Sequence, residues 1–295
     1  MKVFVTGASG FIGLEVVKEL IGAGHKVLGL ARSDVSAKAV AAAGAEVHRG
    51  DVQDLESLRS GAAKADGVIH TAFIHEFSKF KENCEIDRRA IEALGSVLAG
   101  SDRHLVITSG TGIANTVPGQ PSREDNATIS SAVVARAASE EAGVAVAGRG
   151  VNVSVVRLPQ VHNTIKQGLI TYAITLAREK GVSAYVGDGR NRWPAAHLLD
   201  VARLYRLAFE KRVAGAKYHA VTEEGVPVRD IAEAIGRGLK VPVVAISPEE
   251  TAGHFGWLAM FVGHDSPASS ALTRERLGWQ PTGPGLIEDL EGMKY

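Results

Sequence analysis

Short apolar runs alternate with longer segments of helical periodicity over the first half of this chain. Runs rich in β-branched residues are typical of strands, whereas apolar positions three and four apart are typical of one face of a helix. The pattern predicts strands at residues 3–5, 26–30, 46–48, 67–70, 105–108 and 152–157. It predicts helices between them at residues 11–21, 35–42, 55–60, 83–98 and 131–147.

This alternation predicts an α/β fold in which a parallel sheet is covered by helices on both faces. Right-handed crossovers then give a doubly wound sheet of the Rossmann type over residues 1–160, with ligands at the carboxyl ends of its strands. Past Pro159 the pattern changes to helical stretches at residues 168–179, 200–210, 228–238 and 270–277, separated by loops that contain Gly and Pro. Residues 161–295 are therefore expected to form mainly a smaller C-terminal α/β lobe that binds substrate and can return elements to the sheet.

Composition and charge describe an ordinary globular protein of 295 residues. Its 33 basic and 33 acidic side chains cancel, and no basic block suited to a phosphate backbone is present, so we expect no nucleic-acid partner. The only cysteine, Cys84, excludes an intrachain disulfide and a Cys-rich zinc site, which suits a reducing cytoplasm, and we expect no metal. No segment approaches the roughly 18 apolar residues that span a bilayer, so we expect no membrane association.

Three glycines, Gly7, Gly10 and Gly13, follow the first predicted strand and open the first predicted helix. Gly7 permits a tight turn, Gly10 lets main-chain N–H groups approach a phosphate, and Gly13 lets the helix pack closely on the strand. The N-terminus of the helix adds unpaired N–H donors and a partial positive charge. A tight turn without a ligand is the alternative interpretation. The position of the motif, before an amphipathic helix and a second strand, predicts a dinucleotide site.

Six segments of the chain together resemble one protein family in their order and spacing. They are residues 6–13 (TGASGFIG), 50–52 (GDV), 68–72 (VIHTA), 105–109 (LVITS), 156–162 (VRLPQVH) and 277–281 (LGWQP). On these residues the chain resembles the extended short-chain dehydrogenase/reductase superfamily, which includes nucleotide-sugar epimerases, dihydroflavonol reductases and their atypical relatives. The resemblance covers nearly the full length.

The resemblance implies where a nicotinamide dinucleotide is bound. Residues 51–52 are placed at the adenine, residues 71–72 behind the ribose and phosphate, and residues 159–161 at the nicotinamide. A helix N-cap for Asp51 and a strand terminator for Pro159 are the alternative interpretations. The residues expected at the cofactor are, in chain order, Gly7, Ser9, Gly10, Phe11, Ile12, Gly13, Arg32, Ser33, Asp51, Val52, Thr71, Ala72, Thr108, Arg136, Pro159 and Val161.

The end of the second predicted strand bears on the choice between NADP and NAD. Enzymes of this fold that prefer NAD place a carboxylate there, which binds the ribose 2′-hydroxyl and repels a 2′-phosphate. This chain has Arg32 and Ser33 instead, and its first carboxylate, Asp34, is the expected N-cap of the next helix. The Arg32 guanidinium favours NADP as the cofactor, with NAD less favoured. An exposed arginine that contacts nothing is the alternative interpretation.

The catalytic pair that the resemblance implies is missing. In the superfamily a Tyr lies four residues before a Lys on one helix, and the ammonium lowers the pKa of the phenol that exchanges the proton. Aligned on Glu140, this chain has Ala132 and Arg136 at those positions, and no tyrosine occurs between residues 109 and 171. Arg136 remains a candidate catalytic residue that holds ribose hydroxyls, but a guanidinium stays protonated at neutral pH and so cannot relay a proton.

Other side chains are candidates for the proton transfer. The family hydroxyl after the fifth strand aligns with Gly110, which leaves Thr111 and Ser109 as the nearest hydroxyls, unless these are ordinary turn residues. His162 directly follows the nicotinamide segment, and an imidazole titrates near neutrality, so His162 is our first choice for the catalytic acid. His75, in a loop that faces the same cleft, is a further candidate.

Several polar and aromatic side chains are expected to face a small-molecule substrate. Those after residue 190 match the part of the superfamily in which substrate contacts lie. Packing or surface roles are an equally good interpretation of each one, because such residues are often half-buried. The expected substrate residues are His75, Ser109, Arg192, Trp193 and His197.

Three functions remain open. The first is an NADP-dependent oxidoreductase that acts on a small carbonyl or alcohol with a non-standard proton donor. The second is an NADP-binding sensor that has lost its chemistry, which the substitutions at Ala132 and Gly110 would explain. The third is an NAD-dependent sugar epimerase or isomerase, which Arg32 disfavours. In many relatives the helices that correspond to residues 83–98 and 131–147 form a dimer bundle, so we expect a homodimer by analogy.

Overall fold

The computed structural model describes residues 1–114 and 117–295 of the chain. Its centre is a seven-stranded sheet in the order β10-β6-β5-β4-β1-β2-β3, and every neighbouring pair in it is parallel. The strands are β1 (Lys2–Thr6), β2 (Lys26–Ala31), β3 (Glu46–Arg49), β4 (Gly67–His70), β5 (His104–Gly110), β6 (Asn152–Leu158) and β10 (Lys217–His219). The strand order reverses between β1 and β4, as in the doubly wound Rossmann fold, and the predicted fold class is confirmed.

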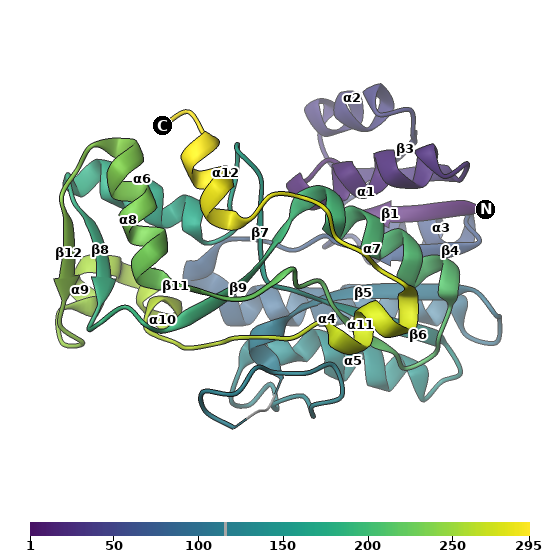
Figure 1. Ribbon diagram of the computed structural model, residues 1–295. Coiled ribbons are helices and arrows are strands. Elements are labelled where there is room, and N and C mark those ends of the chain that lie inside the picture. The colour runs from purple at the N-terminus through teal and green to yellow at the C-terminus, as the bar shows by residue number, and fades with distance from the viewer. Residues whose placement is uncertain (115–116) are drawn as a thin grey trace.

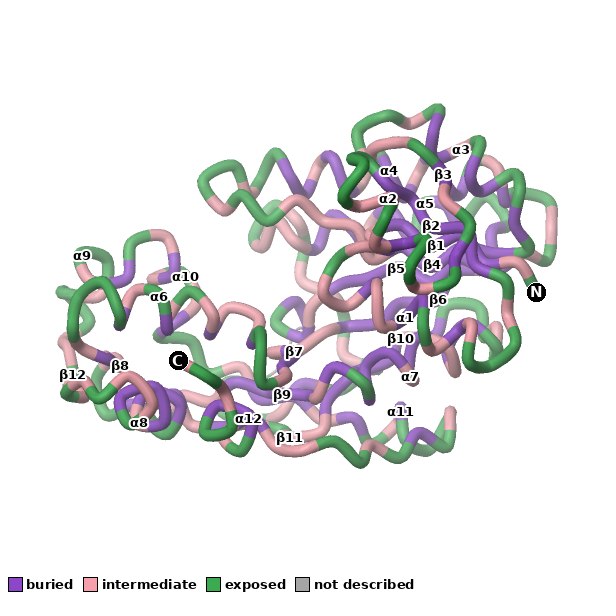
Figure 2. Tube along the Cα trace, turned by 90° about the horizontal axis from the view of Figure 1, so that it is seen from above, coloured by how far each residue is buried: buried purple, intermediate pink, exposed green. Residues whose placement is uncertain are grey.

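Helices cover both faces of this sheet (Figure 1). One face packs against α1 (Phe11–Gly22), α2 (Asp34–Ala42) and α7 (Leu198–Lys211), and the other against α3 (Leu55–Ala63), α4 (Phe80–Leu98) and α5 (Ala138–Ala147). The side chains of successive strand residues point to opposite faces of the sheet. Val3 and Val5 pack in the core on the side of α1 and α7, and Phe4 packs in the core on the side of α3 and α4. The central strands are consequently buried along their length (Figure 2), which is why they read as continuous apolar runs in the sequence.

The helix predicted over residues 131–147 begins only at Ala138, so the predicted start was wrong. A 3₁₀ turn, η3 (Ala135–Ala137), precedes α5. The backbone N–H and the hydroxyl of Ser131 both donate to the carboxylate of Glu141, at 2.8 and 2.6 Å. Because these bonds hold the segment around Ser131 against the side of α5, that segment does not continue the helix towards the N-terminus. Arg136, which we expected on a helix face, therefore lies in the 3₁₀ turn.

The second half of the chain forms a smaller lobe and also completes the main sheet. β10 pairs with β6, and α7 packs on α1. The lobe holds a three-stranded sheet, β11-β9-β7, and a two-stranded sheet, β12-β8 (Figure 1). Its elements, with α11 beside β10, are β7 (Gln160–His162), α6 (Ile170–Lys180), β8 (Ser183–Val186), β9 (Arg192–His197), β11 (Glu223–Pro227), α8 (Val228–Leu239), β12 (Val243–Ile246), α9 (Thr251–Phe255), η4 (Gly256–Leu258), α10 (Ala259–Val262), α11 (Ala271–Leu277) and α12 (Leu286–Gly292). Among the residues that the structure describes, no helix combines the length and the apolar character needed to cross a bilayer.

A buried ion pair fastens α5 to β6. Arg157 donates from Nε to Glu140 Oε1 at 2.7 Å and from Nη2 to Oε2 at 2.8 Å, and both side chains are almost fully buried. The hydroxyl of Thr128 donates to the same carboxylate at 2.5 Å. Burial acts to raise the pKa of Glu140, but the hydrogen bond and charge of Arg157 outweigh it, so the pKa is lowered and the carboxylate stays ionised.

We predict that Glu140→Gln lowers the free energy of unfolding by about 3 kcal/mol, because it leaves the Arg157 guanidinium buried beside a neutral partner. Urea denaturation followed by circular dichroism measures this loss. The matched control is Glu291→Gln, which removes an exposed pair with Arg237 and is expected to cost less than about 1 kcal/mol. Equal losses in the two variants would contradict the assignment of Glu140 as a fold-determining charge.

Candidate functional site

The turn between β1 and α1 is built from backbone alone. Gly7 has a φ of 68°, and a Cβ on it would lie 2.8 Å from the backbone nitrogen of Ala72. A Cβ on Gly13 would lie 2.1 Å from the carbonyl oxygen of Gly7 and 2.9 Å from the Thr71 hydroxyl. Neither position accepts a side chain, because contacts this short do not occur in folded proteins. Gly7, Gly13, Thr71 and Ala72, all predicted at the cofactor, therefore lie together.

The opening of α1 leaves its first donors available. Gly10 is the N-cap and has no side chain to accept from the first N–H groups of the helix, while Phe11 and Ile12 begin the first turn. Gly10 is exposed, and Ser9, Phe11 and Ile12 are half-buried. Gly7 and Gly13 form a glycine cradle, which a Cβ at either position would fill. This cradle and the free N-terminus of α1 fit the diphosphate of a dinucleotide, which the sequence predicted.

The loops after β2 and β3 lie side by side at the same edge of the sheet. Arg32 Nε is 3.5 Å from Asp51 Oδ2, and the Arg32 side chain is 76% exposed, so its guanidinium remains open to a ligand. Ser33 is the N-cap of α2, where its hydroxyl accepts from the backbone N–H of Ser36 at 3.2 Å. Arg49, which our sequence analysis did not single out, pairs with Asp34 at this edge. Val52 follows Asp51 and is half-exposed.

Arg136 is held by an ion pair rather than left for a ligand. Its Nη1 lies 2.8 Å from the buried carboxylate of Asp87, and its Nη2 donates to the Thr108 carbonyl at 3.0 Å. The hydroxyl of Ser139 donates to Asp87 at 2.5 Å, and the guanidinium stacks 4.3 Å from the centre of the Phe73 ring. This arrangement corrects the expectation that Arg136 mainly holds ribose hydroxyls, because the carboxylate already compensates its charge.

Asp87 is the centre of a buried network that the sequence analysis missed. His70 Nε2 lies 2.9 Å from Asp87 Oδ1, and His70 Nδ1 lies 2.7 Å from the Thr6 hydroxyl. Burial acts to raise the pKa of Asp87, but Arg136 and the hydrogen bond from His70 lower it to about 2. The ionised carboxylate requires the His70 proton on Nε2, so Nδ1 accepts from Thr6. His70 is thus a fully buried core histidine with both ring nitrogens hydrogen-bonded.

The hydroxyl groups at the end of β5 face the protein. Thr108 donates to the His70 carbonyl at 2.7 Å and lies 2.7 Å from the Tyr205 hydroxyl, so its side chain is occupied. Thr111, in η2 (Thr111–Ile113), is buried, and its hydroxyl lies 3.5 Å from the Leu158 carbonyl. Ser109 is buried and its hydroxyl lacks a hydrogen-bond partner among the described residues. Ser109 is therefore the hydroxyl of this strand end that can still accept or donate.

His162 lies inside the C-terminal lobe, which corrects its assignment as the first-choice catalytic acid. The imidazole is fully buried, and Nδ1 lies 2.6 Å from Asp289 Oδ2 of α12. Glu223 is 4.0 Å from Nε2, and the His197 ring centre is 5.9 Å away. Burial lowers the pKa of His162 despite the opposing effect of Asp289. The residue before it, Val161, is buried in the core of the main domain, and Pro159 is half-buried.

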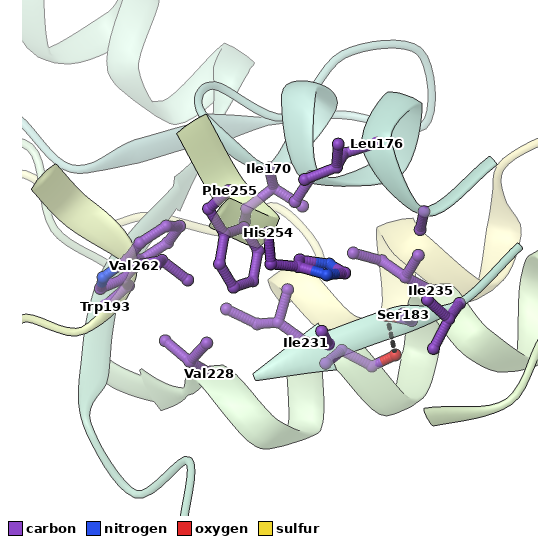
Figure 3. Close-up of a pocket in the computed structure, with 15 residues that line it drawn as sticks. Ile170, Leu176, Ser183, Trp193, Val228, Ile231, Ile235, His254, Phe255 and Val262 are labelled. Carbon is purple, nitrogen blue, oxygen red and sulfur yellow. Dashed lines mark hydrogen bonds between the residues drawn. The ribbon is translucent and has the colours of Figure 1, made fainter. Parts of the chain in front are cut away.

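The substrate residues expected on β9 have structural partners. Arg192 donates from Nε and Nη2 to the Asp265 carboxylate at 3.0 and 2.8 Å. Trp193 is buried, and it lines a cavity of about 20 Å³ together with Phe255 and other apolar side chains (Figure 3). This cavity has room for about one water molecule, so it is no substrate pocket. His197 accepts from the backbone N–H of Leu199 and caps α7.

His75 lies in the loop after β4, beside aromatic rings that join the two lobes. Its ring centre is 5.3 Å from Phe73 and 6.2 Å from Phe77, which belongs to η1 (Phe77–Lys79). Phe77 stacks on Trp257 of the C-terminal lobe at 4.1 Å. The side chain of His75 keeps contact with solvent. Partial loss of hydration, followed by the positive charge of Lys166, lowers the pKa of His75, so the imidazole is mostly neutral at pH 7.

No group of three or more His, Cys, Asp or Glu side chains within residues 1–114 and 117–295 is arranged to hold a metal ion. The site therefore consists of the glycine cradle, the open Arg32 guanidinium, the Ser109 hydroxyl and the His75 loop. All of these lie at or just after the carboxyl ends of β1, β2, β4 and β5. This is the edge at which open parallel sheets bind their ligands.

Comparisons with known proteins agree with the fold. The model of the NAD dependent epimerase/dehydratase family matches residues 3–222. An uncharacterized protein of Schizosaccharomyces pombe is 45% identical over 296 residues, which cover 100% of both chains. UDP-glucose 4-epimerase of Streptomyces lividans is 26% identical over 324 residues, covering 95% of this chain and 92% of the other. The structure of DesIV, a dTDP-glucose 4,6-dehydratase from Streptomyces venezuelae with NAD and TYD bound, superposes with a TM-score of 0.79 at 18% identity, covering 99% and 95% of the two chains.

We predict that Gly13→Ala weakens dinucleotide binding by roughly tenfold or more and lowers the free energy of unfolding by about 2 kcal/mol, because its Cβ would displace the Gly7 carbonyl. Calorimetric titration and urea denaturation measure the two effects. Gly22→Ala is the matched control, since a Cβ there meets nothing within 4 Å at the other end of the same helix. A Gly13→Ala protein that binds and unfolds like the Gly22→Ala protein would show that the close approach has no role.

We predict that Asp87 makes the fold sensitive to acid. Its folded pKa of about 2 lies below the unfolded value of 3.8, so its stabilisation is present above pH 4 and is lost as the pH falls towards 2. The lost free energy amounts to about 2 kcal/mol. In Asp87→Asn this acid-dependent component disappears, whereas Asp102→Asn, which changes an exposed carboxylate, retains it. Urea denaturation at pH 2 to 7 distinguishes the variants, and an unchanged pH dependence in Asp87→Asn refutes the assignment.

Proposed function

The chain belongs to the NAD dependent epimerase/dehydratase family, and on that premise we propose that it is an NADP-dependent oxidoreductase that interconverts a small carbonyl compound and its alcohol. The coarser statement, a nucleotide-binding enzyme of the oxidoreductase or epimerase type, follows from the family. The choice of NADP, the reaction and the residues are our proposal. It also agrees with the resemblance to extended short-chain dehydrogenase/reductases that the sequence motifs carry.

One observation carries the proposal: the glycine cradle and an open guanidinium lie at neighbouring strand ends of one sheet edge. The cradle at Gly7 and Gly13 suits the diphosphate. Arg32 follows β2, one strand away, and its 3.5 Å approach to Asp51 leaves the guanidinium exposed. A planar cation at this position favours a 2′-phosphate. The Arg49 guanidinium, at the end of β3, is paired with Asp34 instead.

The nicotinamide ring of a bound cofactor would supply or take the hydride. The side chains of the protein must therefore orient the carbonyl group of the substrate and exchange a proton with its oxygen. We assign the proton to His75, the candidate imidazole that keeps contact with solvent and is not enclosed by a carboxylate. The aromatic rings of Phe73 and Phe77 limit the motion of its loop. We also assign the carbonyl oxygen to Ser109, whose buried hydroxyl has no hydrogen-bond partner among the described residues. Thr111 and His162 are no longer proposed as proton donors, because protein groups surround each one.

A sensor without catalysis is the second candidate function, and the pairing of Arg136 with Asp87 favours it. The position at which the superfamily carries its lysine is closed by a buried carboxylate at 2.8 Å. A protein that only binds the nucleotide has no need of a proton relay there. The exposed imidazole of His75 and the free hydroxyl of Ser109 favour the enzyme instead, since a sensor gains nothing from them.

Turnover decides between these functions. We expect the purified protein to oxidise NADPH in the presence of one or more small aldehydes or ketones, and to prefer NADPH to NADH by roughly tenfold or more in kcat/KM. The Arg32→Ala variant is expected to lose most of this preference while keeping the rate with NADH. The absence of turnover across a broad carbonyl panel, with NADPH bound, would contradict the enzyme and favour the sensor.

We predict that reduction depends on protonated His75. The pKa of this imidazole is lowered from the ordinary histidine value near 6.5. In the pH profile, kcat/KM therefore falls as the pH rises through this lowered pKa, because the imidazole loses the proton that it must donate. His75→Gln is expected to reduce kcat/KM by roughly 100-fold and to remove this limb. His264→Gln, a change at an exposed histidine of the C-terminal lobe, is the control. A His75→Gln protein with the wild-type pH profile would exclude His75 as the acid.

A further inference from the structure

A tight hairpin at residues 162–167 connects β7 to α6, and its tip holds the side chain of Lys166 near the first turn of α1. His162 and Gln167 pair across its base. The side-chain oxygen of Asn163 accepts from the backbone N–H groups of Ile165 at 2.8 Å and Lys166 at 2.9 Å. The backbone N–H of Asn163 donates to the Lys166 carbonyl at 3.0 Å. The tip is thus ordered by its own hydrogen bonds, and it presents Lys166 without help from any ligand.

Lys166 reaches from the C-terminal lobe to the first turn of α1. Its Nζ lies 5.7 Å from the centre of the Phe11 ring, and Phe11 is the first helical residue after Gly10. The charge of Lys166 also acts on His75, in the loop after β4, where it adds to the effect of lost hydration in lowering the pKa. β7 itself lies between the two lobes (Figure 1). The hairpin therefore extends the second lobe to the diphosphate end of the site.

The charge of Lys166 is uncompensated in the part of the chain that the structure describes. Arg136 is paired with Asp87 and Arg192 with Asp265, each at 2.8 Å. No corresponding hydrogen bond or ion pair joins the Lys166 ammonium to a described residue. An exposed lysine is common on protein surfaces, but this one lies over the ring that begins α1, where the helix dipole disfavours a cation unless an anion separates them.

We propose that Lys166 binds the diphosphate of the dinucleotide, so that the phosphate oxygens lie between the ammonium and the N–H groups of the first turn of α1. This inference rests on the proposed function, because it concerns the same cofactor. The glycine cradle supplies dipoles but no net charge, and Lys166 supplies the missing positive charge from the other lobe. Binding of the nucleotide then joins the two lobes through one ion pair. A phosphate group on the substrate is the other possible source of the anion.

Titrations of Lys166→Gln with three nucleotides test the proposal. NADPH and ADP-ribose both contain the diphosphate, whereas adenosine 2′-monophosphate contains only the phosphate expected at Arg32. We expect Lys166→Gln to bind NADPH and ADP-ribose roughly tenfold more weakly, with a smaller dependence on salt, and to bind adenosine 2′-monophosphate like the wild type. Lys166→Arg is expected to restore most of the affinity. Lys211→Gln, at the far end of α7, is the control and should match the wild type.

The outcomes separate this inference from the proposed function. A wild-type protein that binds no dinucleotide refutes the proposed function itself. A wild-type protein that binds NADPH and ADP-ribose with the same affinity as Lys166→Gln overturns only the role of Lys166. Unchanged nucleotide affinities combined with a raised KM for the carbonyl substrate also overturn it, since the lysine would then serve a substrate anion.

Discussion

The close contact between the Gly7 turn and Gly13 is the constraint on which the rest of the site depends. A Cβ at Gly13 would lie 2.1 Å from the Gly7 carbonyl, so α1 can start against the end of β1 only without side chains at these two positions. That contact aims the first N–H groups of α1 into the crevice where the strand order reverses, between β1 and β4. Thr71 and Ala72, after β4, form the other wall. The fold thereby creates an anion site before any charged side chain is considered.

Charged side chains in this protein fall into two groups with different roles. In one group, Glu140 pairs with Arg157 and fixes α5 to β6, and Asp87 pairs with Arg136 and joins α4 to the 3₁₀ turn before α5. Arg32 keeps most of its guanidinium open at the strand ends and can bind a ligand. Arg136, which aligns with the catalytic lysine of the superfamily, belongs to the first group. The proposed function instead takes its proton from the loop after β4, where His75 retains access to solvent.

The sequence was sufficient for features that depend on local periodicity or on one short motif. Six strands of the main sheet were predicted because burial on both faces makes them largely apolar, whereas the three-residue strand β10 was not predicted. The glycine turn was predicted because its sterics are contained in residues 7–13. The pairing of Arg136 with Asp87 was missed because these residues are 49 positions apart, and only the packing of α4 beside α5 brings them together. The burial of Trp193 in the second lobe was missed for the same reason. The short strands of that lobe have too few residues to show a period.

The most direct test of the anion site is the response of its backbone amides to nucleotide. In an isotope-labelled sample, saturation with NADP should produce the largest amide chemical-shift changes at Gly10, Phe11 and Ile12, with smaller changes around Thr71 and Ala72. The account predicts this pattern because the phosphate oxygens accept from those N–H groups. Shifts confined to other parts of the chain, or none at saturating nucleotide, would contradict it.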